Sequence, residues 1–216
     1  MLFGLLKRRE AWCITWRGRL VVFLVGIVTL MTGVRGCAPF LSANQPVEAQ
    51  VLIVEGWLPD YALKDASEEF KRGKYRYIIT SGGPLLAGYY FSARKSSAEM
   101  AAATLVELGI ASNLVVAVSS PPVARGRTLA EAQSVKKWIQ DQDPDLRSGN
   151  IYTLGAHSRR SWIAFKKALK DRVKVGVIAD ADRAYDMERW WATSEGFRSV
   201  TSEALAYVVM RLHGSL

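Results

Sequence analysis

Apolar residues are arranged along the chain in two different ways. A stretch of fifteen residues without a charged side chain, 20–34, lies between Arg19 and Arg35. From residue 50 onward, short apolar runs alternate with segments whose apolar residues recur at the spacing of an α-helix. The first pattern is typical of a membrane-spanning helix, and the second is typical of a folded α/β domain.

The second region predicts strands and helices in alternation. A continuous apolar run is typical of a strand buried on both faces, and helical periodicity indicates an amphipathic helix. Such alternation favours a parallel sheet with helices on both of its faces. We therefore predict an α/β fold, a Rossmann-like sandwich with a five-stranded, mainly parallel sheet, preceded by one N-terminal transmembrane helix. The predicted strands are 51–55, 77–80, 114–118, 151–154 and 173–178, and the predicted helices are 60–72, 96–108, 128–140, 161–170, 186–194 and 200–212.

Basic residues define the expected orientation of the apolar segment. Five basic residues precede the segment, namely Lys7, Arg8, Arg9, Arg17 and Arg19. Cations resist translocation, so the N-terminus is expected in the cytoplasm and the domain on the outer face of the plasma (inner) membrane. As a helix the fifteen residues measure about 22 Å, which is less than the ~30 Å of the hydrocarbon core. An uncleaved signal-anchor is our prediction, and a cleaved signal peptide is the alternative.

The expected organisation has four parts. Residues 1–19 form a cytoplasmic basic N-terminus, 20–38 the transmembrane signal-anchor, 39–49 a linker, and 50–216 the α/β domain. The linker is predicted because it contains residues that interrupt a helix, namely Pro39, Ser42, Asn44 and Pro46.

Charge and cysteine content exclude several classes of protein. Residues 1–35 hold six basic residues and one acidic residue, so removing them lowers the formal net charge from +9 to +4. Much of the basic character therefore belongs to the membrane flank, and no nucleic-acid partner is predicted. Cys13 and Cys37 flank the apolar segment and cannot pair across a membrane. With two histidines in the chain, neither a metal site nor a cofactor is predicted, and the oligomeric state is left open.

Polar residues cluster where the predicted strands end. In doubly wound α/β folds, ligands bind beyond the carboxyl ends of the strands, where these residues should converge. Arginine side chains and glycine turns suit a phosphate or carboxylate, which makes an anion the predicted ligand. His157 and Glu55 are the proton-transfer candidates. The predicted ligand-binding residues are Ser81, Gly82, Gly83, Arg127, Thr128 and Arg160.

Several of these residues also have a purely structural interpretation. Ser96 with Glu99, and Thr128 with Glu131, match the Ser/Thr-x-x-Glu capping box of a helix N-terminus. Glu55 at the end of a buried strand is costly unless it is paired, so a salt bridge is as well supported as catalysis. No Gly-x-Ser-x-Gly elbow, dinucleotide-binding glycine motif or zinc-ligand spacing is present.

The strand-end residues resemble a bacterial family of unassigned chemistry that includes YdcF, SanA and ElyC. The resemblance rests on Val-Leu-Ile-Val-Glu-Gly at 51–56, Thr-Ser-Gly-Gly at 80–83, the helix at 96–109, the Arg-Thr pair at 127–128 and the block at 155–160. It implies a Rossmann-type domain behind one membrane helix and a role in envelope biogenesis or barrier integrity. This chain departs from the commoner pattern at Ser97 and in its Glu-Gly-Trp turn at 55–57, which indicates a subgroup.

Three functions follow as hypotheses. The first is a membrane-anchored protein that binds an anionic, phosphorylated envelope precursor, with the question of catalysis open. The second is a non-catalytic binding or scaffold module of an envelope complex, which uses the same pocket or Trp190 and Trp191. The third is a nucleotide or S-adenosylmethionine binder, because the resemblance links YdcF with that ligand.

Overall fold

A computed structural model describes residues 14–85, 92–170 and 172–213 of the chain. Lys7, Arg8, Arg9 and Cys13 therefore lie outside the described residues. The chain divides into two compact units, Met1–Gly36 and Cys37–Leu216.

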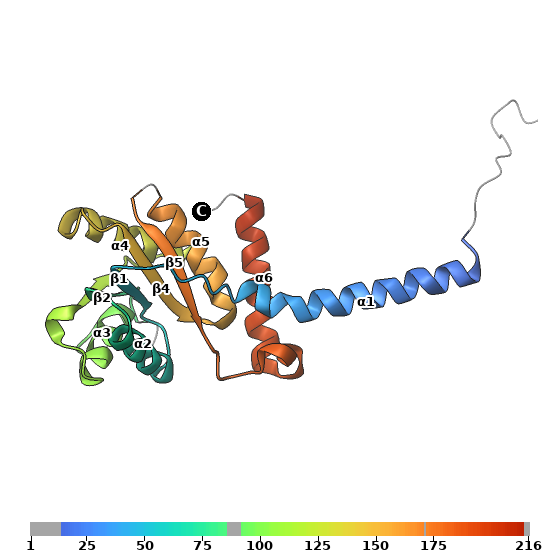
Figure 1. The fold of residues 1–216 in the computed structure, drawn as a ribbon, viewed down its shortest axis with the longest axis horizontal. Coiled ribbons are helices and arrows are strands. Elements are labelled where there is room, and N and C mark those ends of the chain that lie inside the picture. Colours follow the sequence, from blue (N-terminus) through green and yellow to red (C-terminus); the bar gives the residue numbers. More distant parts are fainter. Residues whose placement is uncertain (1–13, 86–91, 171, 214–216) are drawn as a thin grey trace, which may run out of the picture. The chain divides into compact units, whose positions relative to one another are not determined.

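Helix α1 (Trp16–Leu41) contains the apolar segment predicted to enter a membrane (Figure 1). Its most apolar 18-residue window has a mean hydropathy of 2.1, and no residue of that window is buried. A helix of 26 residues is about 39 Å long, which exceeds the ~30 Å of a bilayer core. The chain therefore has one helix, among the described residues, that is long and apolar enough to cross a membrane.

The segment expected to be a linker belongs to the folded domain. Helix α1 continues through Pro39 to Leu41, so the prediction that Pro39 interrupts any helix is wrong. Proline removes one backbone donor, but burial of Ala38 and Leu41 in the domain offsets that loss. Beyond the helix, Gln45 pairs with Val177 in an antiparallel bridge. The domain thus begins at Cys37 and includes residues 39–49.

Across the described residues the strands form the predicted sheet, and all of its pairs are parallel. The spatial order β3-β2-β1-β4-β5 places β1 at the centre, with one half of the domain on either side. The strands are β1 (Val51–Glu55), β2 (Tyr77–Gly82), β3 (Val115–Ser119), β4 (Ser148–Leu154) and β5 (Lys174–Asp180). The Rossmann-like α/β fold predicted from periodicity is therefore confirmed.

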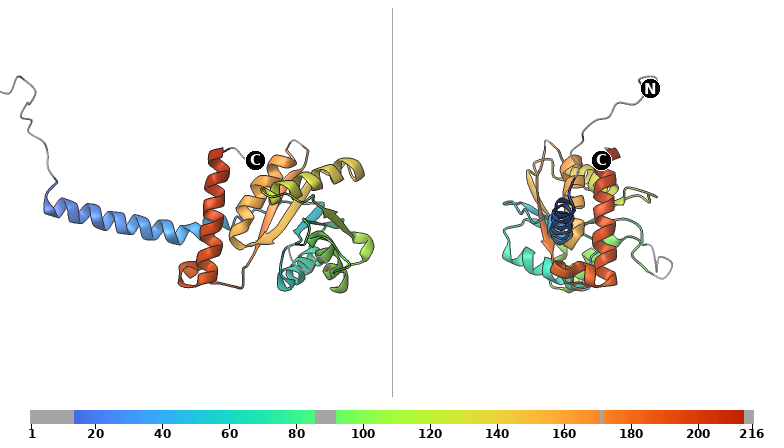
Figure 2. Two further views of the ribbon diagram at one scale, coloured as in Figure 1. Left: turned by 180° about the vertical axis from the view of Figure 1, so that it is seen from behind. Right: turned by 90° about the vertical axis from the view of Figure 1, so that its right-hand side faces the viewer.

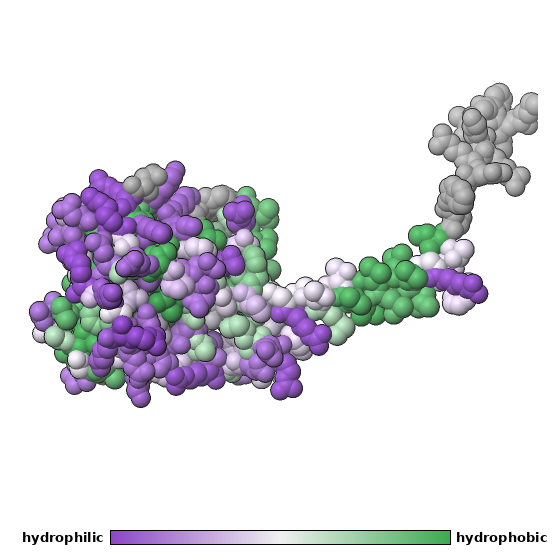
Figure 3. All heavy atoms as spheres, in the orientation of Figure 1, coloured by the Kyte–Doolittle hydropathy of each residue, from purple (hydrophilic) through white to green (hydrophobic). Residues whose placement is uncertain are grey.

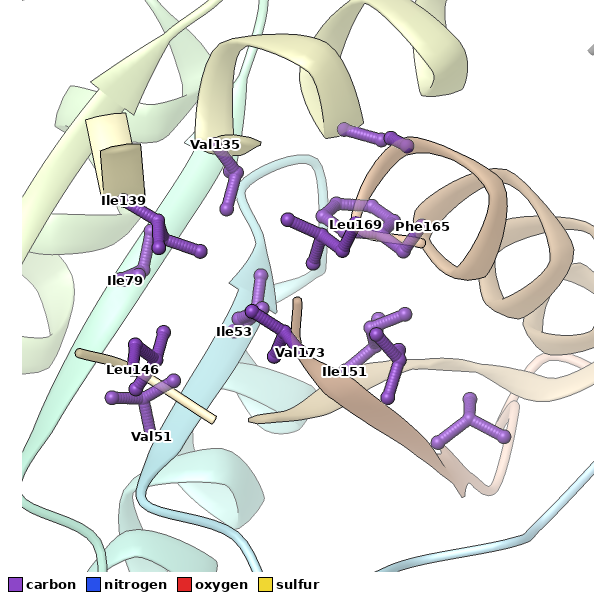
Figure 4. Close-up of a cluster of buried hydrophobic side chains, with 14 of the residues drawn as sticks. Val51, Ile53, Ile79, Val135, Ile139, Leu146, Ile151, Phe165, Leu169 and Val173 are labelled. Carbon is purple, nitrogen blue, oxygen red and sulfur yellow. The ribbon is translucent and has the colours of Figure 1, made fainter. Parts of the chain in front are cut away.

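Helices cover both faces of the sheet, as the apolar pattern requires (Figures 1 and 2). Helices α2 (Asp60–Arg72) and α3 (Ser97–Glu107) bury Leu63, Phe70 and Leu105 against one face. Helices α4 (Arg127–Gln142) and α5 (Ser158–Ala168) cover the other face. Figure 4 shows that second core, in which side chains from α4 and α5 meet those of the central strands. Its labelled residues are Val51, Ile53, Ile79, Val135, Ile139, Leu146, Ile151, Phe165, Leu169 and Val173.

Several elements extend further than the apolar pattern indicates. Strand β2 reaches Gly82 and β5 reaches Asp180, because backbone pairing continues into polar residues at the strand ends. The 3₁₀ turn η2 (Gly155–His157) leads directly into α5, three residues before the predicted start of that helix. A second 3₁₀ turn, η1 (Ser112–Leu114), precedes β3. The last two predicted helices are the 3₁₀ segment η3 (Met187–Ala192) and the long helix α6 (Ser194–His213).

The start of α3 packs tightly on the ends of β1 and β2. Ser96 occupies the N-cap and its hydroxyl accepts a hydrogen bond from the backbone N–H of Glu99, as predicted. A Cβ added at Gly82 would lie 2.1 Å from Ser97 Oγ and 2.7 Å from the backbone nitrogen of Ala98. The close packing of α3 therefore requires a glycine at position 82, so this glycine does not by itself indicate a ligand site.

Neighbouring glycines provide a matched test of this packing. We expect Gly82→Ala to lower the free energy of unfolding by about 1–3 kcal/mol, because the new methyl group overlaps the first turn of α3. Gly83→Ala should cost much less, since its nearest neighbour would be Ser120 Oγ at 3.4 Å. Urea unfolding of the full chain in detergent measures both variants. Equal losses would show that the close approach at Gly82 does not limit stability.

Candidate functional site

A cavity of about 960 Å³ opens beyond the carboxyl ends of the strands. Trp57 and Gly83 line it from the loops after β1 and β2, Arg127 and Glu131 line it from α4, and His157 lines it from η2. This is the edge at which a doubly wound fold binds its ligands. The fold therefore brings several of the predicted site residues together around one hollow.

Glu55 ends the central strand with no exposure to solvent. Ser161 Oγ donates to its Oε1 at 2.7 Å, and Thr153 Oγ1 donates to its Oε2. His157 Nε2 lies 3.7 Å from Oε2. Burial by itself raises the pKa of Glu55, but the charge of His157 and the three hydrogen-bonding groups outweigh it and lower the pKa. Glu55 is therefore a buried carboxylate whose charge is compensated by the hydroxyls of Thr153 and Ser161 and by the imidazole of His157.

His157 lies between two carboxylates. Its Nδ1 is 2.9 Å from Glu203 Oε1 and 2.9 Å from Arg160 Nη2, and Glu55 faces its Nε2. Burial and the charge of Arg160 lower the pKa of His157, but Glu55 and Glu203 together raise it to about 9. The Trp57 ring adds a T-shaped contact at 4.8 Å between ring centroids. At neutral pH the imidazole is thus protonated, and in this form it is able to donate a proton.

Arg160 is held inside the same network. Its Nε donates to Glu203 Oε2 at 2.7 Å and its Nη2 donates to Glu203 Oε1 at 2.9 Å, which forms a bidentate pair. Its Nη1 donates to Thr128 Oγ1 at 3.0 Å. Burial raises the pKa of Glu203, but Arg160 and His157 lower it to about 2. Arg160, predicted to bind an anionic ligand, already binds the carboxylate of Glu203.

Glu203 was not among the residues predicted from the sequence. It lies on α6, 46 positions after His157, and no short motif connects the two. One signal was present, because Glu203 is the single acidic residue of α6 beyond its first turn. A lone carboxylate in the middle of a largely apolar helix needs a partner, and the structure supplies His157 and Arg160.

Glu131 of α4 also faces the cavity, with 7 % of its surface exposed. Its carboxyl makes no hydrogen bond or ion pair among the described residues, unlike those of Glu55 and Glu203. Burial, and next the negative charge of Glu55, raise the pKa of Glu131 to about 7. The two carboxyls therefore differ in state near neutral pH, since Glu55 is ionised and Glu131 titrates.

The capping box predicted for Thr128 and Glu131 is wrong. Helix α4 begins at Arg127, and its N-cap is Gly126, which has a left-handed φ of +69° and provides no side-chain cap. The Thr128 hydroxyl instead accepts the hydrogen bond from Arg160. A capping motif needs its first residue at the N-cap, and here the left-handed glycine starts the helix two residues earlier.

The remaining predicted residues occupy different places. Ser81 is fully buried in register with Glu55, and its hydroxyl has no hydrogen-bond partner among the described residues. Gly83 lines the cavity, whereas Ser81 and Gly82 do not. Arg127 is exposed at the cavity rim with Arg125 beside it. Neither arginine forms an ion pair within the described part of the chain.

The charged side chains around the cavity fall into an interior group that forms ion pairs and two arginines at the rim that do not. Two carboxylates, Glu55 and Glu203, balance the cations His157 and Arg160 in the interior. Arg125 and Arg127 at the N-terminus of α4 form no ion pair among the described residues, although Glu131 and Asp182 line the same cavity. A helix N-terminus itself favours an anion. The arrangement suits an anion held at the rim and a proton transferred in the interior. Within the residues that the structure describes, no cluster of three or more His, Cys, Asp or Glu side chains is placed to hold a metal ion.

Comparison with known proteins adds no assignment. No protein-family model and no curated protein sequence matches this chain. The resemblance to the YdcF, SanA and ElyC family therefore stays a prediction.

The raised pKa of Glu131 predicts a dependence of stability on pH. In the unfolded chain the carboxyl of Glu131 loses its proton near pH 4.5, whereas in the folded chain it keeps the proton up to about pH 7. Its favourable contribution to the free energy of unfolding is therefore complete below pH 4.5 and is lost as the pH rises through about 7. We expect Glu131→Gln to gain up to about 3 kcal/mol of stability relative to the wild type between pH 5 and pH 9. Urea unfolding in detergent tests this, with the exposed Glu107→Gln as control. A constant difference across that pH range contradicts the burial of a neutral Glu131.

The two partners of His157 should have unequal effects on its pKa. Because the charge of Glu55 is the largest factor that raises this pKa, Glu55→Gln should lower it more than Glu203→Gln does. Titration of the imidazole Cε1 resonance by NMR measures the pKa, which we expect at about 9 in the wild type. His213→Gln assigns the resonance, since the chain has two histidines. A pKa near 6.5 in the wild type rules out the imidazolium between two carboxylates.

Proposed function

We propose that this protein is a single-pass membrane protein whose domain binds an anionic, phosphorylated precursor of the cell envelope in the cavity beyond the sheet. The observation that carries the proposal is the contrast between the ion-paired His157, Arg160 and Glu203 inside and the two arginines at the rim, Arg125 and Arg127, which form no ion pair among the described residues. A phosphate at the rim would pair with these two arginines and bind the N-terminal N–H groups of α4.

The proposed location is the plasma (inner) membrane, with the domain outside the cytoplasm. Support comes from the apolar part of α1 and from the basic residues that precede it. The resemblance to the YdcF, SanA and ElyC family supports the same location and an envelope role. A phosphorylated precursor attached to a lipid is available at that membrane surface, so its chemistry matches both the rim and the anchor.

The proposed proton chemistry uses Glu131 and His157. Glu131 faces the cavity and exchanges a proton near neutral pH, which is the property of a general acid or base. His157 is positively charged and lies beside it in the cavity lining. Glu55 does not line the cavity, and its contacts suit it to position His157 instead of contacting a ligand. The sequence prediction of Glu55 as a base is therefore replaced in this proposal by Glu131.

A binding module without chemistry is the second candidate. One observation favours it, because the hydrogen bonds of Arg160 and the Nδ1 contact of His157 are all directed to internal partners. A nucleotide or S-adenosylmethionine binder is less well supported. The carbonyl of Ser97 would lie 2.6 Å from a Cβ added at Gly56, so the start of α3 fills the space beyond β1 where such ligands are held.

Arg127→Ala should weaken binding of a polyprenyl phosphate to the full chain by about tenfold or more, because a charge-assisted contact to phosphate is lost. The measurement is retention of radiolabelled polyprenyl phosphate by protein purified in detergent. The exposed Arg172→Ala is the matched control for loss of one positive charge. Arg160→Ala is a poorer test, since it leaves Glu203 buried without its partner.

Retention that is equal in the wild type, Arg127→Ala and Arg172→Ala would end the proposal of a phosphate site at this rim. Glu131→Gln separates the two candidate functions. Normal ligand retention with loss of complementation in a deletion strain favours proton chemistry, whereas full complementation favours the binding module.

A further inference from the structure

Helix α6 exposes a row of apolar side chains on the side away from the cavity. Its residues Phe197, Leu205 and Leu212 are 53 %, 68 % and 77 % exposed, which is high for large apolar side chains. They recur at helical spacing with Val208, so they lie on one face, and Glu203 points from the opposite face into the cavity. We call Phe197, Leu205, Val208 and Leu212 the apolar face of α6. Figure 3 shows hydrophobic atoms along the C-terminal half of this helix.

The domain attaches to its membrane segment next to this helix. Phe40 packs edge-on against Tyr207 of α6, with ring centroids 5.4 Å apart, and the Arg159 guanidinium lies over the Phe40 ring. Val34 is the last residue of the apolar run, only six positions before Phe40. Six residues span at most about 22 Å even when fully extended. Chain connectivity alone therefore keeps Phe40, which contacts α6 through Tyr207, within that distance of the end of the apolar segment.

The charges of α6 are suited to a lipid surface. Arg198 and Arg211 are exposed, and from residue 204 to 213 the helix contains no acidic residue. An apolar face flanked by arginine is typical of helices that lie in the headgroup region and bind anionic lipid. A second copy of the chain would also cover apolar side chains, but it gives no reason for the attachment point beside Tyr207.

We propose that α6 lies in the membrane interface and buries its apolar face among the lipids that hold the anchor. The proposal rests on the membrane location proposed above, and it is independent of the ligand. Because Ser199 and Glu203 of the same helix line the cavity, this contact would hold the cavity at a fixed height above the lipid headgroups. A lipid-linked ligand would then reach the cavity without leaving the membrane surface.

Fluorescence quenching tests the contact in the full chain. Cys13 and Cys37 are replaced by serine, and an environment-sensitive dye is attached at Leu205→Cys or, as control, at the exposed end of α3 in Glu107→Cys. Each protein is reconstituted at low density in vesicles of phosphatidylcholine and phosphatidylglycerol that carry a nitroxide on the lipid chains. Lipid quenching should be at least about threefold stronger at position 205 than at 107.

Two further arms make the result decisive. Val208→Glu with Leu212→Glu should reduce the quenching at position 205 to the control level, because the carboxylates oppose entry into lipid. Binding of polyprenyl phosphate by the same variant is measured in detergent, and unchanged binding separates this proposal from the phosphate site. Equal quenching at positions 205 and 107 overturns the proposal. So does a dye response at position 205 that disappears on diluting the protein in lipid, since that result identifies a second copy as the occupant.

Discussion

The burial of one carboxylate, Glu55 at the end of the central strand, governs how the rest of the site is built. A charge without access to solvent is tolerated only where the protein surrounds it with donors and an opposite charge. Thr153 of the neighbouring strand and Ser161 of α5 supply the hydroxyls, and His157 supplies the charge. Glu55 therefore constrains both the register of β1 with β4 and the packing of α5 on the sheet.

The compensation continues outward from Glu55. His157 also contacts a second carboxylate, Glu203 of α6, and Glu203 in turn binds Arg160. This succession adds polar contacts between the C-terminal helix and the centre of the sheet to the apolar packing of Val200 and Met210. Ser199 and Glu203 of the same helix line the cavity, while its apolar face stays exposed.

Hydrophobic periodicity predicted the strands and helices well because burial on the sheet is a local property of each segment. The bounds of β1 and α2 were predicted to the residue, since a continuous apolar run and the flanking Pro59 and Gly73 mark them clearly. Polar motifs were less reliable. Ser96 caps its helix as expected, whereas Thr128, in the same motif, binds Arg160 because Gly126 already starts α4. The motif describes what a local segment is able to form, and neighbouring elements decide whether it does.

The sequence by itself determined the apolar segment near the N-terminus, the α/β alternation and the convergence of Glu55, His157, Arg127 and Arg160 on one edge of the sheet. These features follow from patterns along the chain and from the fixed geometry of parallel strands. Only the tertiary structure decided that Glu203 neutralises Arg160, that Glu131 titrates near neutral pH and that the residues after Cys37 belong to the domain. Charge states and pairings depend on distances between residues far apart in the chain, and hydrophobic periodicity contains no information about those distances.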